Sequence, residues 1–243
     1  AGTVDTATAG TYTLTYSAID SAGNEATAIT RTIIVADTIA PVIVLNGAAN
    51  LSHEQGTTYT DAGATASDIA DGSVTVTTSG TVDTTTAGTY TLTYSATDSA
   101  GNAASAVTRT VIVADTMAPI ITLSGSASVN HEQGTTYSDA GASASDSVDG
   151  SVSVTTSGTV DTATAGTYTL TYTATDSAGN AATALTRTVI VADTVVPVIT
   201  LSGSASVNHE QGTAYTDEGA TASDLVDGTI SVGTTGSVNF NVV

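Results

Sequence analysis

Aspartate is the residue type of this chain with the clearest chemical potential, because it recurs in one pattern at a fixed spacing. Asp68, Asp71 and Asp98 each have a second aspartate 78 residues further along the chain. Several carboxylates gathered in one place repel one another unless a cation joins them. Carboxylate oxygens without cysteine suit Ca²⁺, which takes about six to eight oxygen ligands. We therefore predict Ca²⁺ as the cofactor wherever the fold brings these side chains together.

The predicted calcium ligands lie in glycine-containing loops or in the link between repeats. They are Asp20, Asp37, Asp68, Asp71, Asp98, Asp115, Asp146, Asp149, Asp176, Asp193, Asp224 and Asp227. A second interpretation stays open, because Asp and Asn also build ordinary turns by bonding their own backbone, and Gly supplies the positive φ. The single histidine of each repeat, such as His53, lacks a second nitrogen or thiol ligand and predicts a surface turn.

A 78-residue repeat organises the chain. Pro41, Pro119 and Pro197 are 78 residues apart, and self-similarity at a fixed period indicates an array of like modules. This period is too long for a solenoid repeat and suits one small domain per repeat. The predicted domains are a C-terminal half-module at residues 1–36, complete modules at 37–114 and 115–192, and an N-terminal half-module at 193–243.

Charge restricts the partners and the chemistry. The chain has 23 acidic residues, three arginines and no lysine, for a formal net charge of −20. Nucleic acid and anionic membranes repel such a chain, and no apolar run approaches the ~20 residues of a membrane span. We expect neither nucleic-acid binding nor membrane insertion. We expect no enzyme either, because no catalytic triad, phosphate-binding loop or cysteine nucleophile is recognisable.

The local pattern predicts strands and no helices. Between residues 89 and 97, apolar and hydroxyl side chains alternate, so Tyr90, Leu92, Tyr94 and Ala96 should face a core. Gly- and Asp-rich stretches separate such runs at the spacing of a sandwich. The fold class is therefore all-β, as tandem immunoglobulin-like β-sandwich modules arranged end to end. The predicted strands of one copy cover residues 42–45, 57–67, 73–78, 81–83, 89–97 and 105–113.

Five short motifs carry a resemblance to a known family. They are Asp37-Thr-x-x-Pro, Tyr59-Thr-Asp-Ala-Gly, Asp68-x-x-Asp-Gly, Gly88-Thr-Tyr and Asp98-Ser-Ala-Gly-Asn. Together they resemble the bacterial immunoglobulin-like repeat modules of large surface adhesins and extracellular repeat proteins. The resemblance implies an extracellular, cell-surface location and a spacer role.

Such a sandwich has two further consequences for the residues. Its N-terminus and two of its loops lie at one end, which should gather Asp37, Asp68, Asp71 and Asp98 there. Tyr90 stands where a tyrosine hydroxyl bonds back to the backbone at a corner between strands.

The two half-modules predict the partner. Neither half can close a sandwich alone, and each would present an apolar face and unpaired strand edges to water. The expected partner is the protein itself. Either the repeats continue covalently, or residues 193–243 of one copy take up residues 1–36 of the next, head to tail, as a homopolymer. The tail at 237–243 departs from the repeat, which favours a true C-terminus or records ordinary divergence.

The sequence therefore predicts an extracellular structural protein that forms a stiff rod. The rod is either a self-assembling surface filament or a segment of a long adhesin stalk. The alternative is an adhesive binding module that recognises a glycan or a host protein through loops at the sandwich ends. Loops that nearly coincide between copies, and the shortage of aromatic residues, favour the structural interpretation.

Overall fold

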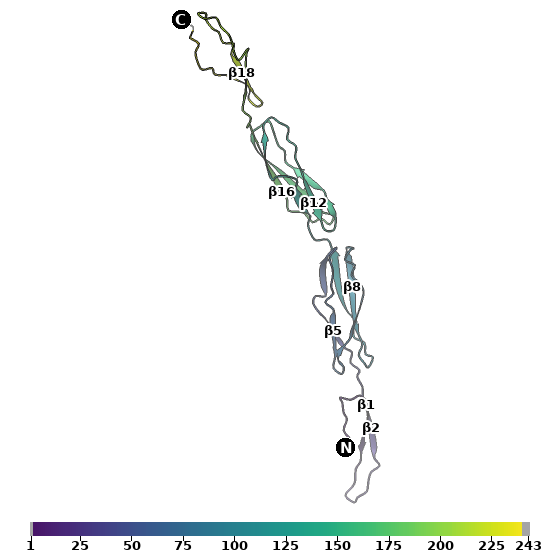
Figure 1. Ribbon diagram of the computed structural model, residues 1–243. Coiled ribbons are helices and arrows are strands. Elements are labelled where there is room, and N and C mark those ends of the chain that lie inside the picture. Colours follow the sequence, from purple (N-terminus) through teal and green to yellow (C-terminus); the bar gives the residue numbers. More distant parts are fainter. Residues whose placement is uncertain (1, 240–243) are drawn as a thin grey trace. The chain divides into compact units, whose positions relative to one another are not determined.

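The computed structural model describes residues 2–239, and all its regular elements are strands (Figure 1). None of the described residues belongs to a helix that could cross a membrane. The chain divides between Thr116 and Met117 into two compact units, which are described separately. The predicted all-β fold is confirmed. Of the divergent tail at 237–243, Phe240 and the residues after it lie outside the described residues.

The complete module of the first unit has two sheets. Its three-stranded sheet has the order β3-β5-β6, and its four-stranded sheet has the order β4-β9-β8-β7. Strand β4 runs parallel to β9, and the other neighbours are antiparallel. The strands are β3 (Val42–Leu45), β4 (Asn50–Glu54), β5 (Ala64–Asp68), β6 (Gly72–Val74), β7 (Val76–Ser79), β8 (Gly88–Ala96) and β9 (Val107–Ala114).

The complete module of the second unit repeats this topology. Its sheets have the orders β10-β12-β13 and β11-β16-β15-β14, with β11 parallel to β16. The strands are β10 (Ile120–Leu123), β11 (Ser128–Glu132), β12 (Ala142–Asp146), β13 (Gly150–Val152), β14 (Val154–Ser157), β15 (Gly166–Ala174) and β16 (Leu185–Ala192).

Each unit also contains one half-module. In the first unit, β1 (Gly10–Tyr16) and β2 (Ile29–Val35) form a two-stranded sheet that matches β8 and β9. In the second unit, β17 (Val198–Leu201), β18 (Ala220–Asp224) and β19 (Gly228–Ile230) form a three-stranded sheet that matches β3, β5 and β6. The described half-modules therefore hold opposite sheets of the sandwich.

Alternation along β8 explains the core. Leu92, Tyr94 and Ala96 are buried and pack against Ile43 and Ala66 from the opposite sheet. These inward positions confirm the period-two prediction. Burying a large apolar side chain contributes about 1.5–3 kcal/mol, so a core of this size gives a module a modest stability.

Three strand predictions are wrong and one element was missed. The predicted single strand at 73–78 is two strands, β6 and β7, which belong to different sheets. Residues 81–83 form no strand, because Asp83 accepts hydrogen bonds from the amide and the hydroxyl of Thr85 and holds a turn there. The run at 57–67 is a strand only from Ala64 onward.

Strand β4 was not predicted, and His53 lies in it rather than in a surface turn. The parallel partner β9 satisfies the backbone of this strand, and a short segment with little alternation gives no such signal in the sequence. The corner tyrosine is confirmed, since the Tyr90 hydroxyl donates to the Thr86 carbonyl at 2.8 Å.

A buried arginine joins the two halves of the module. Arg109 of β9 is 1% exposed and forms an ion pair with Asp61, which precedes β5. The Tyr94 hydroxyl lies 2.8 Å from both carboxylate oxygens of Asp61 and accepts a hydrogen bond from Arg109 Nη1 at 3.1 Å. We call Arg109, Asp61 and Tyr94 the arginine cluster. Arg187, Asp139 and Tyr172 form the same cluster in the second unit.

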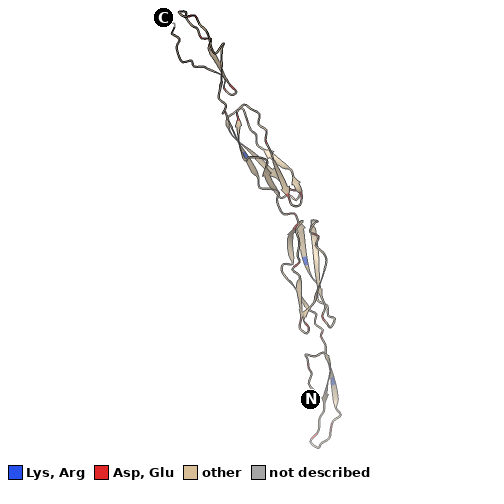
Figure 2. Cartoon of the chain, in the orientation of Figure 1, with Lys and Arg blue, Asp and Glu red and all other residues tan. Residues whose placement is uncertain are grey.

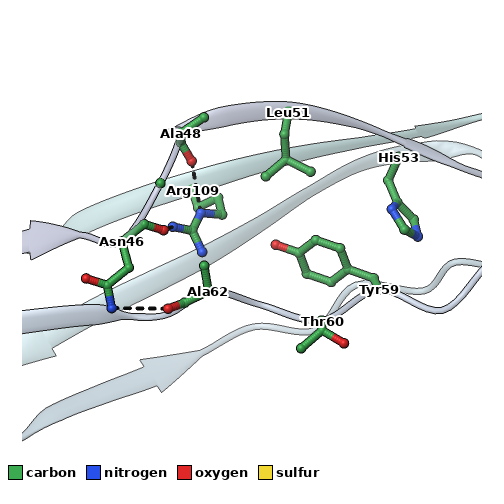
Figure 3. Close-up of a pocket in the computed structure, with 9 residues that line it drawn as sticks. Asn46, Ala48, Leu51, His53, Tyr59, Thr60, Ala62 and Arg109 are labelled. Atoms are coloured by element: carbon green, nitrogen blue, oxygen red, sulfur yellow. Dashed lines mark hydrogen bonds between the residues drawn. The ribbon is translucent and has the colours of Figure 1, made fainter.

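Backbone carbonyls take the remaining protons of the guanidinium (Figure 3). Arg109 Nε donates to the Ala48 carbonyl at 3.0 Å. Nη2 donates to the carbonyls of Asn46 and Gly63. All five N–H groups of the side chain therefore have acceptors, which satisfies a buried charge that would otherwise be costly.

The arginine cluster shifts the pKa of its members. Desolvation alone would raise the pKa of Asp61, but hydrogen bonds from Tyr94 and Arg109 and the guanidinium charge hold it below its ordinary value. Burial, followed by the bond to the Asp61 carboxylate, raises the pKa of Tyr94 to about 12. The cluster therefore favours an ionised Asp61 and a protonated Tyr94.

Replacing Arg109 should unfold its module selectively. The variant Arg109→Met leaves the half-buried Asp61 without its cation and the backbone carbonyls around it without their donor, and we expect a loss of about 3 kcal/mol in the free energy of unfolding. Denaturant unfolding measures the loss, with the intact second module as internal reference. The control Thr108→Ala, at an exposed neighbour on β9, should change stability by less than about 1 kcal/mol. An Arg109→Met module as stable as the control would contradict this role.

Stability should fall at both ends of the pH scale. The lowered pKa of Asp61 makes its contribution complete above about pH 3.9 and lost as pH falls through the folded value. The raised pKa of Tyr94 makes its contribution complete below about pH 10 and lost as pH rises toward about 12. The variant Tyr94→Phe with Tyr172→Phe should flatten the alkaline arm in denaturant unfolding. An unchanged alkaline arm would show that other groups cause it.

Candidate metal centre

Three of the predicted ligands meet at one end of the first complete module. Asp37 precedes β3, Asp71 lies between β5 and β6, and Asp98 follows β8. One carboxylate oxygen of each lies within 4.8 Å of the others. We call these three residues the acidic triad. Three converging carboxylates carry a like charge that a divalent cation would neutralise.

Asp98 is the most enclosed member of the acidic triad. It is 8% exposed. Its oxygens accept hydrogen bonds from the backbone amide of Asn102 at 2.7 Å and from the Asn102 side chain at 2.8 Å. Burial opposes ionisation, but these donors and the Gly101 and Ala100 amides outweigh it and hold the pKa of Asp98 below its ordinary value. Asp98 therefore stays ionised at neutral pH.

Asp71 and Asp37 differ in the hydrogen bonds that their carboxylate oxygens accept. The amide of Ser99 donates to Asp71 at 2.6 Å and its hydroxyl at 2.8 Å, which ties the two loops together. Asp37 Oδ1 accepts from the Ile39 amide, but Asp37 Oδ2 is buried with no hydrogen-bond partner. An enclosed carboxylate oxygen without a donor is the kind of atom that a cation would satisfy.

Asp68, the fourth predicted ligand, lies outside the acidic triad. Its Oδ1 accepts from the amides of Ala70 and Asp71, as in an ordinary Asp-led turn, while its Oδ2 is buried without a partner. The turn interpretation and the ligand interpretation thus describe different atoms of the same residues. The turns hold the carboxylates in place, and oxygen lone pairs remain for an ion.

The second unit keeps the local geometry in its complete module. Asp149 accepts from the amide and hydroxyl of Ser177, and Asp176 accepts from the amide and side chain of Asn180. Asp146 accepts from the amides of Val148 and Asp149. Asp115, the predicted ligand that is equivalent to Asp37, belongs to the first unit, which ends at Thr116.

The half-module of the second unit gathers its acids as well. Oxygens of Asp193, Asp224 and Asp227 lie within 4.8 Å of one another. Desolvation, then the charges of Asp224, Glu132 and Asp227, raise the pKa of Asp193. Asp20, in the half-module of the first unit, is exposed and bonds to Asn24.

Two interactions near the predicted calcium ligands could hardly be predicted from the sequence. Glu54 accepts from the amide of Thr116 at 3.1 Å and from its hydroxyl, so it fixes the chain that leaves β9. Its other oxygen, Oε1, is buried without a partner. The pairing of Ser99 with Asp71 links loops 28 residues apart, and a single serine in a loop gives no sign of such a partner.

A pocket lies beside His53 in the first complete module. It is lined by Leu51, His53, Tyr59 and Arg109 among others (Figure 3). The His53 ring stacks edge-on against Tyr59, and its Nε2 lies 3.1 Å from the Thr57 hydroxyl. Because Arg109 has given all its protons to internal acceptors, the pocket offers no free cation to an anionic ligand.

The chain has three arginines and no lysine to balance its acidic residues. The three arginines lie on strands β2, β9 and β16, and none lies in the loops that carry the acidic triad (Figure 2). No described arginine therefore neutralises the acidic triad, and the described ion pairs are those of Arg109 and Arg187. Carboxylate oxygens are the donors that Ca²⁺ prefers.

Comparison with known families identifies the modules. The model of the family described as "Bacterial surface protein, Ig-like domain" matches residues 1–35, 43–113 and 121–191. The chain belongs to this family. It is a surface immunoglobulin-like repeat protein, as the motifs suggested, and each match lies within one predicted domain. No curated protein matches the chain.

Solved structures give weaker likenesses. The chain is similar to a lipoprotein from Bacteroides thetaiotaomicron, with 18% identity, coverage of 60% of this chain and 99% of that one, and a TM-score of 0.29. It is also similar to extracellular cadherin domains 3–6 of protocadherin gamma B2, with 16% identity, coverage of 91% and 69%, and a TM-score of 0.32.

The aspartates should titrate in a defined order. Asp193, whose pKa is raised by burial and like charges, should protonate at a higher pH than Asp98, whose pKa is lowered by its donors. Carboxyl-carbon NMR in metal-free buffer measures both. The variant Asp224→Asn removes one of the neighbouring charges and should lower the pKa of Asp193 while leaving Asp98 unchanged. The reverse order, or an Asp193 that ignores the substitution, would contradict the described geometry.

Proposed function

We propose that the chain is a run of structural modules that form a stiff rod in an extracellular bacterial surface protein, and that calcium held by the acidic triad stiffens it. The observation that carries the proposal is the convergence of Asp37, Asp71 and Asp98, with one buried oxygen of Asp37 left without a donor. Calcium would neutralise the like charges and fasten the link before β3 to the two loops.

The repetition of the modules supports a mechanical role over catalysis. The two complete copies differ at 17 of 78 positions, and Asp37, Asp71 and Asp98 all recur in the second copy. A binding or active site is normally built once, whereas a structural site serves every module. The saturated Arg109 and the scarcity of exposed aromatic residues also weigh against a recognition surface in this part of the chain.

Calcium should stabilise the module that carries the acidic triad. We expect isothermal titration calorimetry of the full chain to show Ca²⁺ binding. Stability should rise by about 2.7 kcal/mol when free Ca²⁺ is 100-fold above the dissociation constant. The variant Asp37→Asn keeps the oxygen that bonds Ile39 and neutralises the unpartnered one, so it should bind one ion fewer.

The matched control is Asp83→Asn, at an exposed turn aspartate of the same module. It should bind as many ions as the parent chain. In EDTA, Asp37→Asn should be as stable as the parent or more stable, because it relieves repulsion. Absence of binding heat, together with a melting temperature that EDTA leaves unchanged, would overturn the calcium proposal and leave the turns as the sole role of these residues.

A further inference from the structure

The chain enters and leaves the first complete module at opposite ends of strand β9. Asp37, which precedes β3, lies beside the loop that leads into β9, because the Asn102 side chain donates to the Asp37 carbonyl at 3.3 Å. The chain leaves at Ala114, the last residue of β9. The 8 residues of this strand span about 26 Å. Tension between the two links of the module therefore acts along β9.

Strand β4 ties the entering chain to β9. After β3 the chain crosses at residues 46–49 and then runs along β4 in the same direction as β9, since these two strands are parallel. Five residue pairs join them, from Asn50 with Thr110 to Glu54 with Ala114. A pull on the two links draws the strands in opposite directions along their shared axis. Because parallel ladder bonds are evenly spaced between the strands, this sliding loads all of them together.

Two further backbone hydrogen bonds fasten the ends of this pair. Before β4 begins, the Thr110 amide donates to the Ala49 carbonyl at 2.8 Å. After β4 ends, the Gln55 amide donates to the Ala114 carbonyl at 3.0 Å. We call the β4–β9 ladder together with these two bonds the parallel clamp.

Two side chains add to the parallel clamp. Arg109 reaches from β9 to the Ala48 carbonyl, as Figure 3 shows. At the other end, Glu54 accepts from the Thr116 amide at 3.1 Å. The segment that enters the module and the segment that leaves it are thus joined along the whole pair and into the link.

The second complete module repeats this arrangement. Its strands β11 and β16 are parallel and share five residue pairs. The Thr188 amide donates to the Ala127 carbonyl at 2.9 Å, and the Gln133 amide donates to the Ala192 carbonyl at 3.0 Å. The two side-chain contacts recur as well. The parallel clamp is therefore a property of the repeat.

The pairing of β3 with β5 is the weaker connection at the entry. It has four residue pairs, and one further amide bond joins Asn46 to the Gly63 carbonyl at 3.0 Å. Tension reaches this pairing first, because β3 directly follows the link. Its loss would leave the sheet of four strands in place, whereas sliding of β4 past β9 would remove an edge strand and the Arg109 contacts together.

We propose that the parallel clamp is the force-bearing connection of each complete module, so that the module resists tension along the chain beyond what its small core provides. This role goes beyond the proposed rod and rests on it only in that the chain is loaded along its length. Forced unfolding is governed by the unfolding rate and not by the equilibrium stability. A module with a modest core can therefore open slowly under load.

The variant Gln55→Pro tests the clamp with little disturbance of the fold. Gln55 and Gly56 are the central residues of a turn, and φ of Gly56 is 78°. The Thr57 amide closes this turn on the Glu54 carbonyl at 3.4 Å. Proline is favoured at the first central position of such a type II turn, but it has no N–H to give to the clamp. The control Gln55→Ala keeps that amide and loses the side-chain bond to the Thr85 carbonyl.

The measurement is the unfolding of the full chain in optical tweezers, with handles at the two ends of the chain. The parent should show one event for each complete module. In Gln55→Pro, one event should be about fivefold or more faster at a fixed force than in Gln55→Ala, which is the loss expected for one hydrogen bond. The event of the intact second module is the internal reference. Equal rates for the two variants would overturn the proposal.

The direction of pulling gives a second test, which leaves the clamp intact. Because the chain has no cysteine, handles can be attached to Asn50→Cys/Thr108→Cys, two exposed positions where both strands begin. Pulling from this common end peels β4 from β9 one pair at a time and should open the module at a clearly lower force than pulling from the chain ends. An equal or higher force would overturn the proposal and leave β4 as a cover for the sheet edge.

A core variant separates mechanical resistance from equilibrium stability. Leu92→Ala removes a buried side chain of β8 and should lower the denaturant midpoint of its module more than Gln55→Pro does. Its unfolding rate under force should nevertheless change less, because the core is still packed when the clamp slides. The opposite order under force would assign the load to the core and overturn the proposal.

Pulling in Ca²⁺ and in EDTA separates this proposal from the calcium proposal. The bond of Gln55 lies where the chain leaves the module, whereas the acidic triad lies where it enters. The difference between Gln55→Pro and Gln55→Ala should therefore persist in EDTA. A clamp effect without calcium binding overturns the calcium proposal alone, and calcium binding without a clamp effect overturns the clamp alone.

Discussion

A buried guanidinium determines how each repeat holds together. Arg109 is 1% exposed and meets a carboxylate, a tyrosine hydroxyl and three backbone carbonyls. Its acceptors come from the first half of the repeat, apart from Tyr94, which lies on the neighbouring strand. Because a charge in the interior requires every one of these partners, the two halves of a module must come together as one set. The contacts of the guanidinium therefore add to the stability of a core that has few large side chains.

This requirement explains the contrast between complete modules and half-modules. Tyr94 and Tyr172 are fully buried, while Tyr16 is not. The half-modules keep their hairpin or three-stranded sheet, because local antiparallel pairing needs no partner sheet, but inner-face residues such as Tyr16 and Ile199 are exposed. The acidic triad also needs both halves of the module. Loops from both halves deliver Asp71 and Asp98, so the closing of the sandwich also assembles the acidic triad.

Much of the fold could be predicted from the sequence. The alternation of apolar and hydroxyl residues indicates which side of a strand is buried, and the 78-residue repeat indicates the modules. Leu92 and Tyr94 had to face one side of a strand, and Tyr90 had to meet the backbone at a corner. Strand β4 could not be predicted, because its partner β9 lies about 60 residues away and its side chains barely alternate. The convergence of all three members of the acidic triad was predicted, and Asp68, which was predicted with them, lies outside the triad because its Oδ1 accepts from the amides of its own loop. Which carboxylate oxygens lack a hydrogen bond depends on donors from other loops, such as Ser99, and the sequence does not show which loops meet.

Hydrogen exchange tests most directly whether a repeat is closed only when both halves are present. The amides of β8 and β9 should exchange slowly in a dilute solution of the full chain. Those of β1 and β2, with the same sequence pattern but without Asp61 or its equivalent at hand, should exchange much faster. Equal protection of the two hairpins at a concentration where the chain is monomeric would contradict the account, since it would mean that the hairpin is stable without the half that supplies the carboxylate.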